Sequence, residues 1–312
     1  MKGRIFYLSL LQTTLLMSIF FLGAPSTTQA VGDLHVYSMP GVWAQDLPTS
    51  WFTNLHLRYF DFDKIFDSDG NKTDVTGMDG FQIIGKVGHV YRVNDQWQLT
   101  NVLTIPRTHL TARSIPGIGD MSASGFSDWI STNTLGWHNR ANSLHLSTGF
   151  SLTFPLGDYS SDDPINMGKN RWILYFPYAF IHGRLPVFDG LLMIDNSVGI
   201  EWRFENSDIG WDDHDVLEAN LILTYFLSRQ AKFGVFVQPD LQMALNESTL
   251  KGIGQNDSDF YTFGGALGIL YTPKSTCMLH LKYTQELFGR EINDGAPAPV
   301  IKAWHFIMTY LF

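Results

Sequence analysis

The sequence predicts an all-β protein, a transmembrane antiparallel up-and-down β-barrel of about twelve strands preceded by a cleaved signal peptide. Three observations predict this fold. Apolar and polar residues alternate with a period of two in one segment after another. The connections between these segments alternate between short turns and long polar loops, as in outer-membrane barrels. The chain also ends on a strand with an aromatic face.

The amino-terminus has the layout of a secretory signal peptide. Lys2 and Arg4 precede a mostly apolar stretch at 5–22, and small residues follow it up to Ala30. The alternative, an uncleaved anchor helix, is disfavoured because polar residues interrupt the apolar stretch, which must be about 20 residues long to span a bilayer. We therefore expect a signal peptide at 1–30, a periplasmic segment at 31–49 and the barrel at 50–312.

Composition limits the remaining classes of function. Acidic residues outnumber basic ones by 30 to 21, which argues against a basic surface that binds nucleic acid. Cys277 is the single cysteine, so an intramolecular disulfide is excluded. No motif with the spacing of a cofactor or metal site stands out, and we expect neither.

Twelve segments have the alternation of strands with one apolar and one polar face. In 144–154, for example, the even positions are apolar except for Thr148, and the odd positions are polar or small. Most segments have about 10 residues or more, as tilted bilayer-crossing strands need. The predicted strands are 51–62, 81–93, 97–105, 126–137, 144–154, 172–181, 192–204, 217–227, 233–245, 260–271, 277–287 and 300–312.

The connections predict the orientation of the barrel. Short turns at one rim indicate the periplasmic side, and long loops at the other indicate the cell surface. With an even number of strands, both chain ends lie on the periplasmic side. The short turns are 94–95, 139–142, 182–190, 228–230 and 272–275, and the long loops are 63–80, 106–125, 156–171, 205–216, 247–259 and 289–299.

The last strand has an apolar face that ends on the terminal phenylalanine. We expect this face to contact outer-membrane lipid, and the strand resembles the signal that the barrel-assembly machinery of Gram-negative bacteria reads. A soluble β-sandwich is disfavoured because its strands are shorter and its loops do not alternate in length. The residues of this assembly signal are Trp304, Phe306, Met308, Tyr310 and Phe312.

Residues of the opposite parity are predicted to line the lumen, and their charges are of both signs. Such groups either line a path for solutes or form ion pairs that brace a closed barrel, and the sequence leaves both interpretations open. Apolar contacts are expected from the inward-facing Phe60, Phe236 and Phe260. The charged and histidine candidates are His56, Arg58, Lys86, Arg92, His145, Asp195, Glu201, Arg203, Glu218, Asp240, His280, Lys282 and Glu286.

Three patterns suggest chemistry only superficially. His145 and Ser147 share a strand face, but such neighbours are about 7 Å apart, too far for the hydrogen bond of a hydrolase. The stretch 67–74 resembles a calcium loop but lacks the acidic twelfth ligand, since Met78 takes that place. The acidic stretch 211–215 contains a histidine, yet neighbouring residues of one loop rarely complete a coordination shell, and we expect an acidic outer loop.

Two phrases carry a family resemblance: "GIGDMSASGFSDWISTNTLGWH" at 117–138 and "GFSLTFPLGDYSSDDPINMGKNRWILYFPYAF" at 149–180. In order and spacing they resemble the outer-membrane transporters of the phenol-degradation MetA-pathway family. The resemblance implies a barrel through which small hydrophobic or aromatic compounds pass, and it carries over no catalytic residue. The motif residues are Gly117, Gly119, Asp120, Gly157, Asp158, Asn166, Asn170, Arg171 and Trp172.

We hypothesise that Asp120, Asp158 and Arg171 form ion pairs that draw two long loops over the mouth of the barrel. The sequence thus predicts a passive outer-membrane channel for small hydrophobic or aromatic solutes. One alternative is a structural or surface-interaction barrel with a closed, salt-bridged lumen. A second and weaker alternative is an outer-membrane hydrolase.

Overall fold

The structure is a computed structural model, and it describes residues 46–67, 69–115, 119–161, 165–250, 252–254, 259–292 and 298–312. The predicted signal peptide and Gly117 lie outside the described residues. In the described part of the chain, twelve long strands form one antiparallel sheet. They are β1 Ser50–Phe66, β2 Lys72–Arg92, β3 Trp97–Ile115, β5 Trp129–Asn139, β6 Leu144–Phe154, β7 Ile173–Val187, β8 Gly190–Arg203, β10 Val216–Phe226, β11 Phe233–Ala244, β14 Asp259–Lys274, β15 Cys277–Ile292 and β17 Lys302–Leu311.

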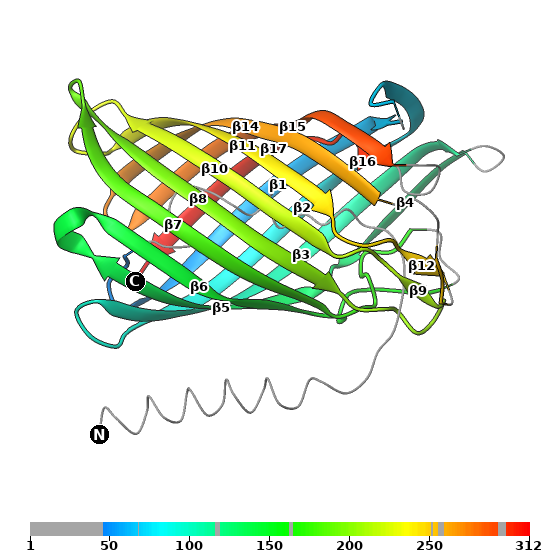
Figure 1. The fold of residues 1–312 in the computed structure, drawn as a ribbon, viewed down its shortest axis with the longest axis horizontal. Coiled ribbons are helices and arrows are strands. Elements are labelled where there is room, and N and C mark those ends of the chain that lie inside the picture. The colour runs from blue at the N-terminus through cyan, green and yellow to red at the C-terminus, as the bar shows by residue number, and fades with distance from the viewer. Residues whose placement is uncertain are drawn as a thin grey trace.

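The sheet closes into a barrel because the first strand pairs on both of its edges. Leu57 of β1 lies opposite Ile83 of β2 on one side and opposite Phe306 of β17 on the other. Every other long strand pairs with its neighbours in the chain, so the topology is up-and-down as predicted. Figure 1 shows the tilted strands of this closed barrel. Closure gives each long strand of the described chain a partner on both sides within the barrel wall.

The two ends of the barrel differ as the sequence predicts. At the end that we call the short-turn rim, tight connections join β2 to β3 and β14 to β15, a 3-10 turn (η2, Arg140–Asn142) joins β5 to β6, and the carboxy-terminus lies nearby (Figure 1). The opposite end, the long-loop rim, carries short additional strands. They are β4 Gly119–Phe126, β9 Trp211–Asp212, β12 Thr249–Leu250, β13 Ile253–Gly254 and β16 Ala298–Pro299.

Two of the predicted loops, 63–80 and 106–125, are largely strand. β1 and β2 continue as a hairpin in which Ile65 lies opposite Thr73, and β3 continues to pair with β4. The prediction missed these extensions because they stand beyond the apolar band, where neither face needs apolar residues and the alternation is lost. For the same reason the strand predicted at 126–137 divides after Phe126, and β5 begins at Trp129.

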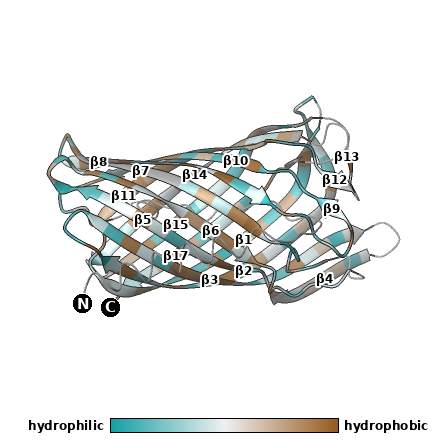
Figure 2. Cartoon of the chain, turned by 60° about the horizontal axis from the view of Figure 1, so that its bottom comes forward, coloured by the Kyte–Doolittle hydropathy of each residue, from teal (hydrophilic) through white to brown (hydrophobic). Residues whose placement is uncertain are grey.

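The outer and inner faces of the barrel follow the predicted parity. In β17, Trp304, Phe306 and Met308 are exposed on the outside, whereas His305 and Ile307 between them are buried. Figure 2 shows hydrophobic and hydrophilic residues alternating along the strands. Such a surface is stable where lipid replaces water around it. Among the described residues, no helix has the length and hydropathy needed to cross a membrane.

Candidate functional site

Most of the charged side chains predicted to line the lumen are buried inside the barrel. Lys86 and His145 are half-buried, and Arg92 is exposed at the short-turn rim. The interior therefore keeps charged groups away from bulk water. Inside the barrel each charge needs a partner or an ion. The buried members of the predicted set are His56, Arg58, Asp195, Glu201, Arg203, Glu218, Asp240, His280, Lys282 and Glu286.

One wall of the lumen is basic. The adjacent strands β15, β17, β1 and β2 carry Lys282, His305, Arg58 and Lys86 on their inner faces. Lys282 is repelled by Arg58 and Lys86 and attracted by Asp240 of β11. Arg58 Nη1 donates a hydrogen bond of 3.1 Å to Gln82 Oε1.

Histidines extend the basic wall. His56 Nε2 lies 2.9 Å from His305 Nδ1, and His305 Nε2 lies 3.0 Å from Thr284 Oγ1. His305 makes one contact through each ring nitrogen, so in the neutral ring one of them donates and the other accepts. His280 lies further along β15, and its ring meets the Phe236 ring edge to face at 6.4 Å.

The wall formed by β8, β10 and β11 is acidic. It carries Asp195, Glu218 and Asp240, all buried. Amides accompany them: Asn220 Nδ2 donates to Ser197 Oγ at 2.6 Å, and Gln242 Nε2 donates to Glu218 Oε1 at 3.4 Å. In the ring of strands, β8 and β10 lie opposite β1 and β17. The acidic and basic walls therefore create an electric field across the lumen.

Apolar clusters lie on both sides of the charged zone. Phe60 packs with Ile301 and Ala303 toward the long-loop rim, and Leu191, Phe226 and Leu270 pack together toward the short-turn rim. The interior is therefore not uniformly polar, in contrast to the lumen of a water-filled porin.

The three phenylalanines predicted to face inward occupy different places along the lumen. Phe60 and Phe236 are buried, and the half-buried Phe260 packs against the cluster of Phe66 and Val300 near the long-loop rim. The ring of Phe236 packs against Gly268, where a Cβ atom would come within 2.3 Å of it. Glycine at this position makes room for the aromatic ring on the inner wall.

The two motif phrases meet at the long-loop rim, where they form what we call the Asp128 clamp: Asp128, Gly157, Gly168 and Lys169. Asp128 Oδ1 accepts from the Gly157 amide at 2.9 Å, and Oδ2 accepts from the Lys169 amide at 2.6 Å. Gly157 and Gly168 pack backbone to backbone, and a Cβ atom on Gly157 would lie 2.6 Å from Gly168 Cα. Burial raises the pKa of Asp128, while the two amide hydrogen bonds oppose that shift.

The ion pairs hypothesised for the motif residues take a different form. Asp158 uses its Oδ2 atom to accept from the Phe126 amide at 2.8 Å, and Asp120 is exposed on β4. The partner of Arg171 is Asp213, with Nη2 to Oδ2 at 2.7 Å. Sequence alone does not indicate this pair because Asp213 belongs to another loop, 42 residues away.

Asp213, within the stretch 211–215 that the sequence predicts as an acidic outer loop, is the centre of a buried ion network. Arg203 Nη1 lies 3.2 Å from Asp213 Oδ2, and Arg203 Nε donates to Glu201 Oε1 at 2.5 Å. Burial alone would raise the pKa of Asp213, but Arg171 and Arg203 hold it well below its usual range. Burial lowers the pKa of His214 to about 4, so this ring is neutral at pH 7.

The remaining motif residues hold the loop to its surroundings. Asn166 accepts from the Ser160 amide at 2.8 Å and donates to the Ser160 carbonyl oxygen at 2.9 Å. Asn170 adopts a positive φ of 48° and donates to Asn206 Oδ1 at 3.0 Å. Trp172 meets Phe154 edge to face at 5.3 Å. The phrases that carry the family resemblance thus build an ordered rim.

Sequence reasoning missed two further groups, Asp128 and the pair His138 and His145 at the short-turn rim. Asp128 binds backbone amides 29 and 41 residues away, and backbone partners leave no trace in the sequence. His138 lies directly opposite His145 in the β5–β6 hairpin, with its Nδ1 atom 2.9 Å from His145 Nδ1. His145, the imidazole that the hydrolase alternative needs as a base, is thus hydrogen-bonded to the imidazole of His138.

The closed barrel, its apolar outer face and its charged lumen define a channel-like barrel of the type found in Gram-negative outer membranes. The chain belongs to the family described as "Putative MetA-pathway of phenol degradation", which matches residues 45–291. This match confirms the resemblance carried by the motif phrases.

Solved structures show the same fold. An outer membrane channel from Pseudomonas putida F1 is 18% identical, with a TM-score of 0.75 over 88% of this chain and 100% of that one. The transport unit of the autotransporter AIDA-I from Escherichia coli is 8% identical, with a TM-score of 0.55 over 89% of this chain and 94% of that one. Among curated proteins, none matches this sequence.

Proposed function

We propose that the protein is a passive outer-membrane channel for small hydrophobic or aromatic solutes. The observation that supports this proposal is the order of surfaces along the lumen, in which apolar clusters lie on both sides of a charged zone. A solute with an apolar body gains contact with each cluster, and its polar group meets fixed charges in between. The family description, which refers to phenol degradation, agrees with solutes of this kind.

The experiment is reconstitution of residues 31–312 in liposomes and planar bilayers. Entry of toluene or phenol above the rate for empty liposomes, together with ion conductance, is the expected result. Phe236→Ala should lower the preference for toluene over glycerol because it removes an aromatic contact from the inner wall. Val237→Ala is the matched control, since Val237 is the next residue of β11 and faces outward.

A barrel with a closed lumen is the second candidate, and one observation favours it. His56, Arg58, His280, Lys282 and His305 are each at most 1% exposed, so solvent does not reach the middle of the basic wall in this structure. If a folded, heat-modifiable barrel shows no conductance and no solute entry, the channel proposal is overturned. The ordered long-loop rim would then become the place to look for a surface interaction.

A further inference from the structure

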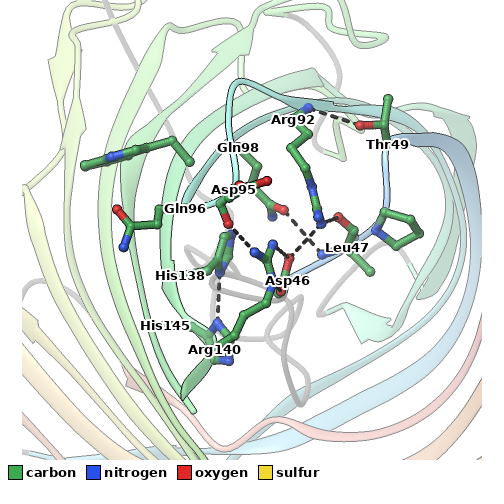
Figure 3. A network of polar contacts seen from close by, with 12 residues as sticks. Asp46, Leu47, Thr49, Arg92, Asp95, Gln96, Gln98, His138, Arg140 and His145 are labelled. Carbon is green, nitrogen blue, oxygen red and sulfur yellow. Dashed lines mark hydrogen bonds and ion pairs between the residues drawn. The ribbon is translucent and has the colours of Figure 1, made fainter. Parts of the chain in front are cut away.

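The short-turn rim brings together three side chains with the atoms of a metal site. Asp46, His138 and His145 each offer one ligand atom, and these atoms lie within 4.8 Å of one another. Asp46 precedes β1, whereas the two histidines lie opposite each other near the end of the β5–β6 hairpin (Figure 3). Residues more than 90 positions apart in the chain are therefore held at one point.

We propose that Asp46, His138 and His145 bind a divalent transition-metal ion of the copper or nickel type. The site is separate from the lumenal zone to which the transport proposal refers, and it stands whether or not the barrel conducts. Two imidazole nitrogens and a carboxylate oxygen form a donor set that suits such ions.

The two imidazoles are close enough to share one ion, and their separation, which is that of a hydrogen bond between the rings, matches a ligand angle of about 90° more closely than a tetrahedral one. At a metal–nitrogen distance of about 2.0–2.1 Å, a tetrahedral zinc ion needs its nitrogen ligands about 3.3–3.4 Å apart. The Nδ1 atoms of His138 and His145 are 2.9 Å apart, which corresponds to an angle at the metal of about 90°. Right angles between ligands are typical of the tetragonal geometry of Cu²⁺ and Ni²⁺, and Cu²⁺ binds more tightly of the two.

The carboxylate keeps an acceptor position for the ion. Asp46 Oδ1 accepts from Arg92 Nη2 and Arg140 Nη2, both at 3.0 Å, and Oδ2 accepts from Arg140 Nε at 2.5 Å. A carboxylate offers about four lone-pair positions, so three donors leave about one. Arg140 also donates to the Asp95 carbonyl oxygen, and these contacts hold Asp46 beside the histidines (Figure 3).

The surroundings of the His138 ring limit the affinity of the site. The His138 ring is buried, and its Nε2 atom lacks a hydrogen-bond partner among the described residues. When the metal occupies Nδ1, Nε2 carries the proton, and a buried N–H without an acceptor makes binding less favourable. The two arginines repel a dication, which limits the affinity, and we expect dissociation constants in the micromolar range.

The test is a titration of tag-free residues 31–312 in detergent with CuCl₂, followed by calorimetry and by electron paramagnetic resonance. We expect one Cu²⁺ per chain with hyperfine coupling to two nitrogens. His138→Ala and His145→Gln should each weaken binding at least tenfold and remove one nitrogen coupling, and Asp46→Asn should weaken binding while both couplings persist. The matched control is His109→Ala on β3, whose ring bonds Ser124 Oγ away from the site.

Three outcomes would overturn the proposal: no binding at 100 μM Cu²⁺, equal binding by His145→Gln and the wild type, or a spectrum without two nitrogens. The half-buried His145 tolerates exchange more readily than the buried His138, so His145→Gln keeps the test decisive if His138→Ala does not fold. Heat modifiability of each variant establishes that the barrel is closed.

Discussion

Replacing Asp128 with alanine tests whether a single carboxylate holds the long-loop rim in order. The carboxylate accepts from two backbone amides, those of Gly157 and Lys169. Each buried N–H that loses its acceptor costs about 1–3 kcal/mol, or about 2–6 kcal/mol for both. Because burial of this carboxylate is itself unfavourable, as its raised pKa indicates, removing it returns part of that cost. We therefore expect a local loss of about 2–4 kcal/mol.

Hydrogen exchange of the Gly157 and Lys169 amides measures this loss directly. A change of about 1.4 kcal/mol is tenfold in an equilibrium constant, so protection of both amides should fall about 30-fold to 1,000-fold. Asp128→Asn keeps one acceptor oxygen and should give an intermediate loss. Asp189→Asn is the matched control, because Asp189 is exposed in the turn between β7 and β8 at the other rim. Unchanged protection in Asp128→Ala, or an equal loss throughout the barrel, would refute the reasoning.

Three further predictions follow from the rim and from the outer face. Gly168→Ala places a methyl group 2.8 Å from the backbone carbon of Gly157, so the free energy of opening of the Asp128 clamp, measured by hydrogen exchange, should fall by about 1–3 kcal/mol. Gly77→Ala, with its nearest atom at 3.7 Å, should change this free energy little. The pKa of His214 in the folded loop, about 4, lies below the ordinary 6.5, so the open form of the loop takes up the proton first. The stability of the loop should therefore decline as the pH falls from about 6.5 to 4. In His214→Gln, the rate of proteolysis of the loop should lose this pH dependence. Phe306→Arg puts a charge on the lipid face near the middle of β17, and the free energy of unfolding by urea in liposomes should fall by about 2–4 kcal/mol. The control Asp189→Arg should not cause this loss.

The strands were predictable because a bilayer forces one face of each strand to be apolar. The alternation in 144–154 locates β6, and the parity of β17 places Trp304 outside and His305 inside. Where the strands rise above the lipid this constraint ends, and β4 and the extensions of β2 and β3 were missed.

The candidate sites were harder to predict than the strands. Parity places Arg58 and Asp240 in the lumen, but which charges meet depends on the register between strands, which no short pattern encodes. Asp46 and Asp128 were missed because their partners lie far away in sequence or belong to the backbone, and His138 was missed because its contact with His145 depends on the register of the β5–β6 hairpin. The motif phrases pointed to the correct rim, although the partner of Arg171 proved to be Asp213.

The closure of the barrel by its first and last strands has a consequence for how the protein is made. Asn54 Nδ2 donates to Thr309 Oγ1 across 255 residues of chain, so the seam between β1 and β17 forms only after synthesis has reached the final strand. Until then β1 exposes an unpaired edge, and contacts of such long sequence separation are the slowest to form. Closure of the ring is therefore the last strand pairing that can form, and a truncation that removes Tyr310 and Leu311 would delete the Thr53–Tyr310 and Phe52–Leu311 pairs at one end of the seam.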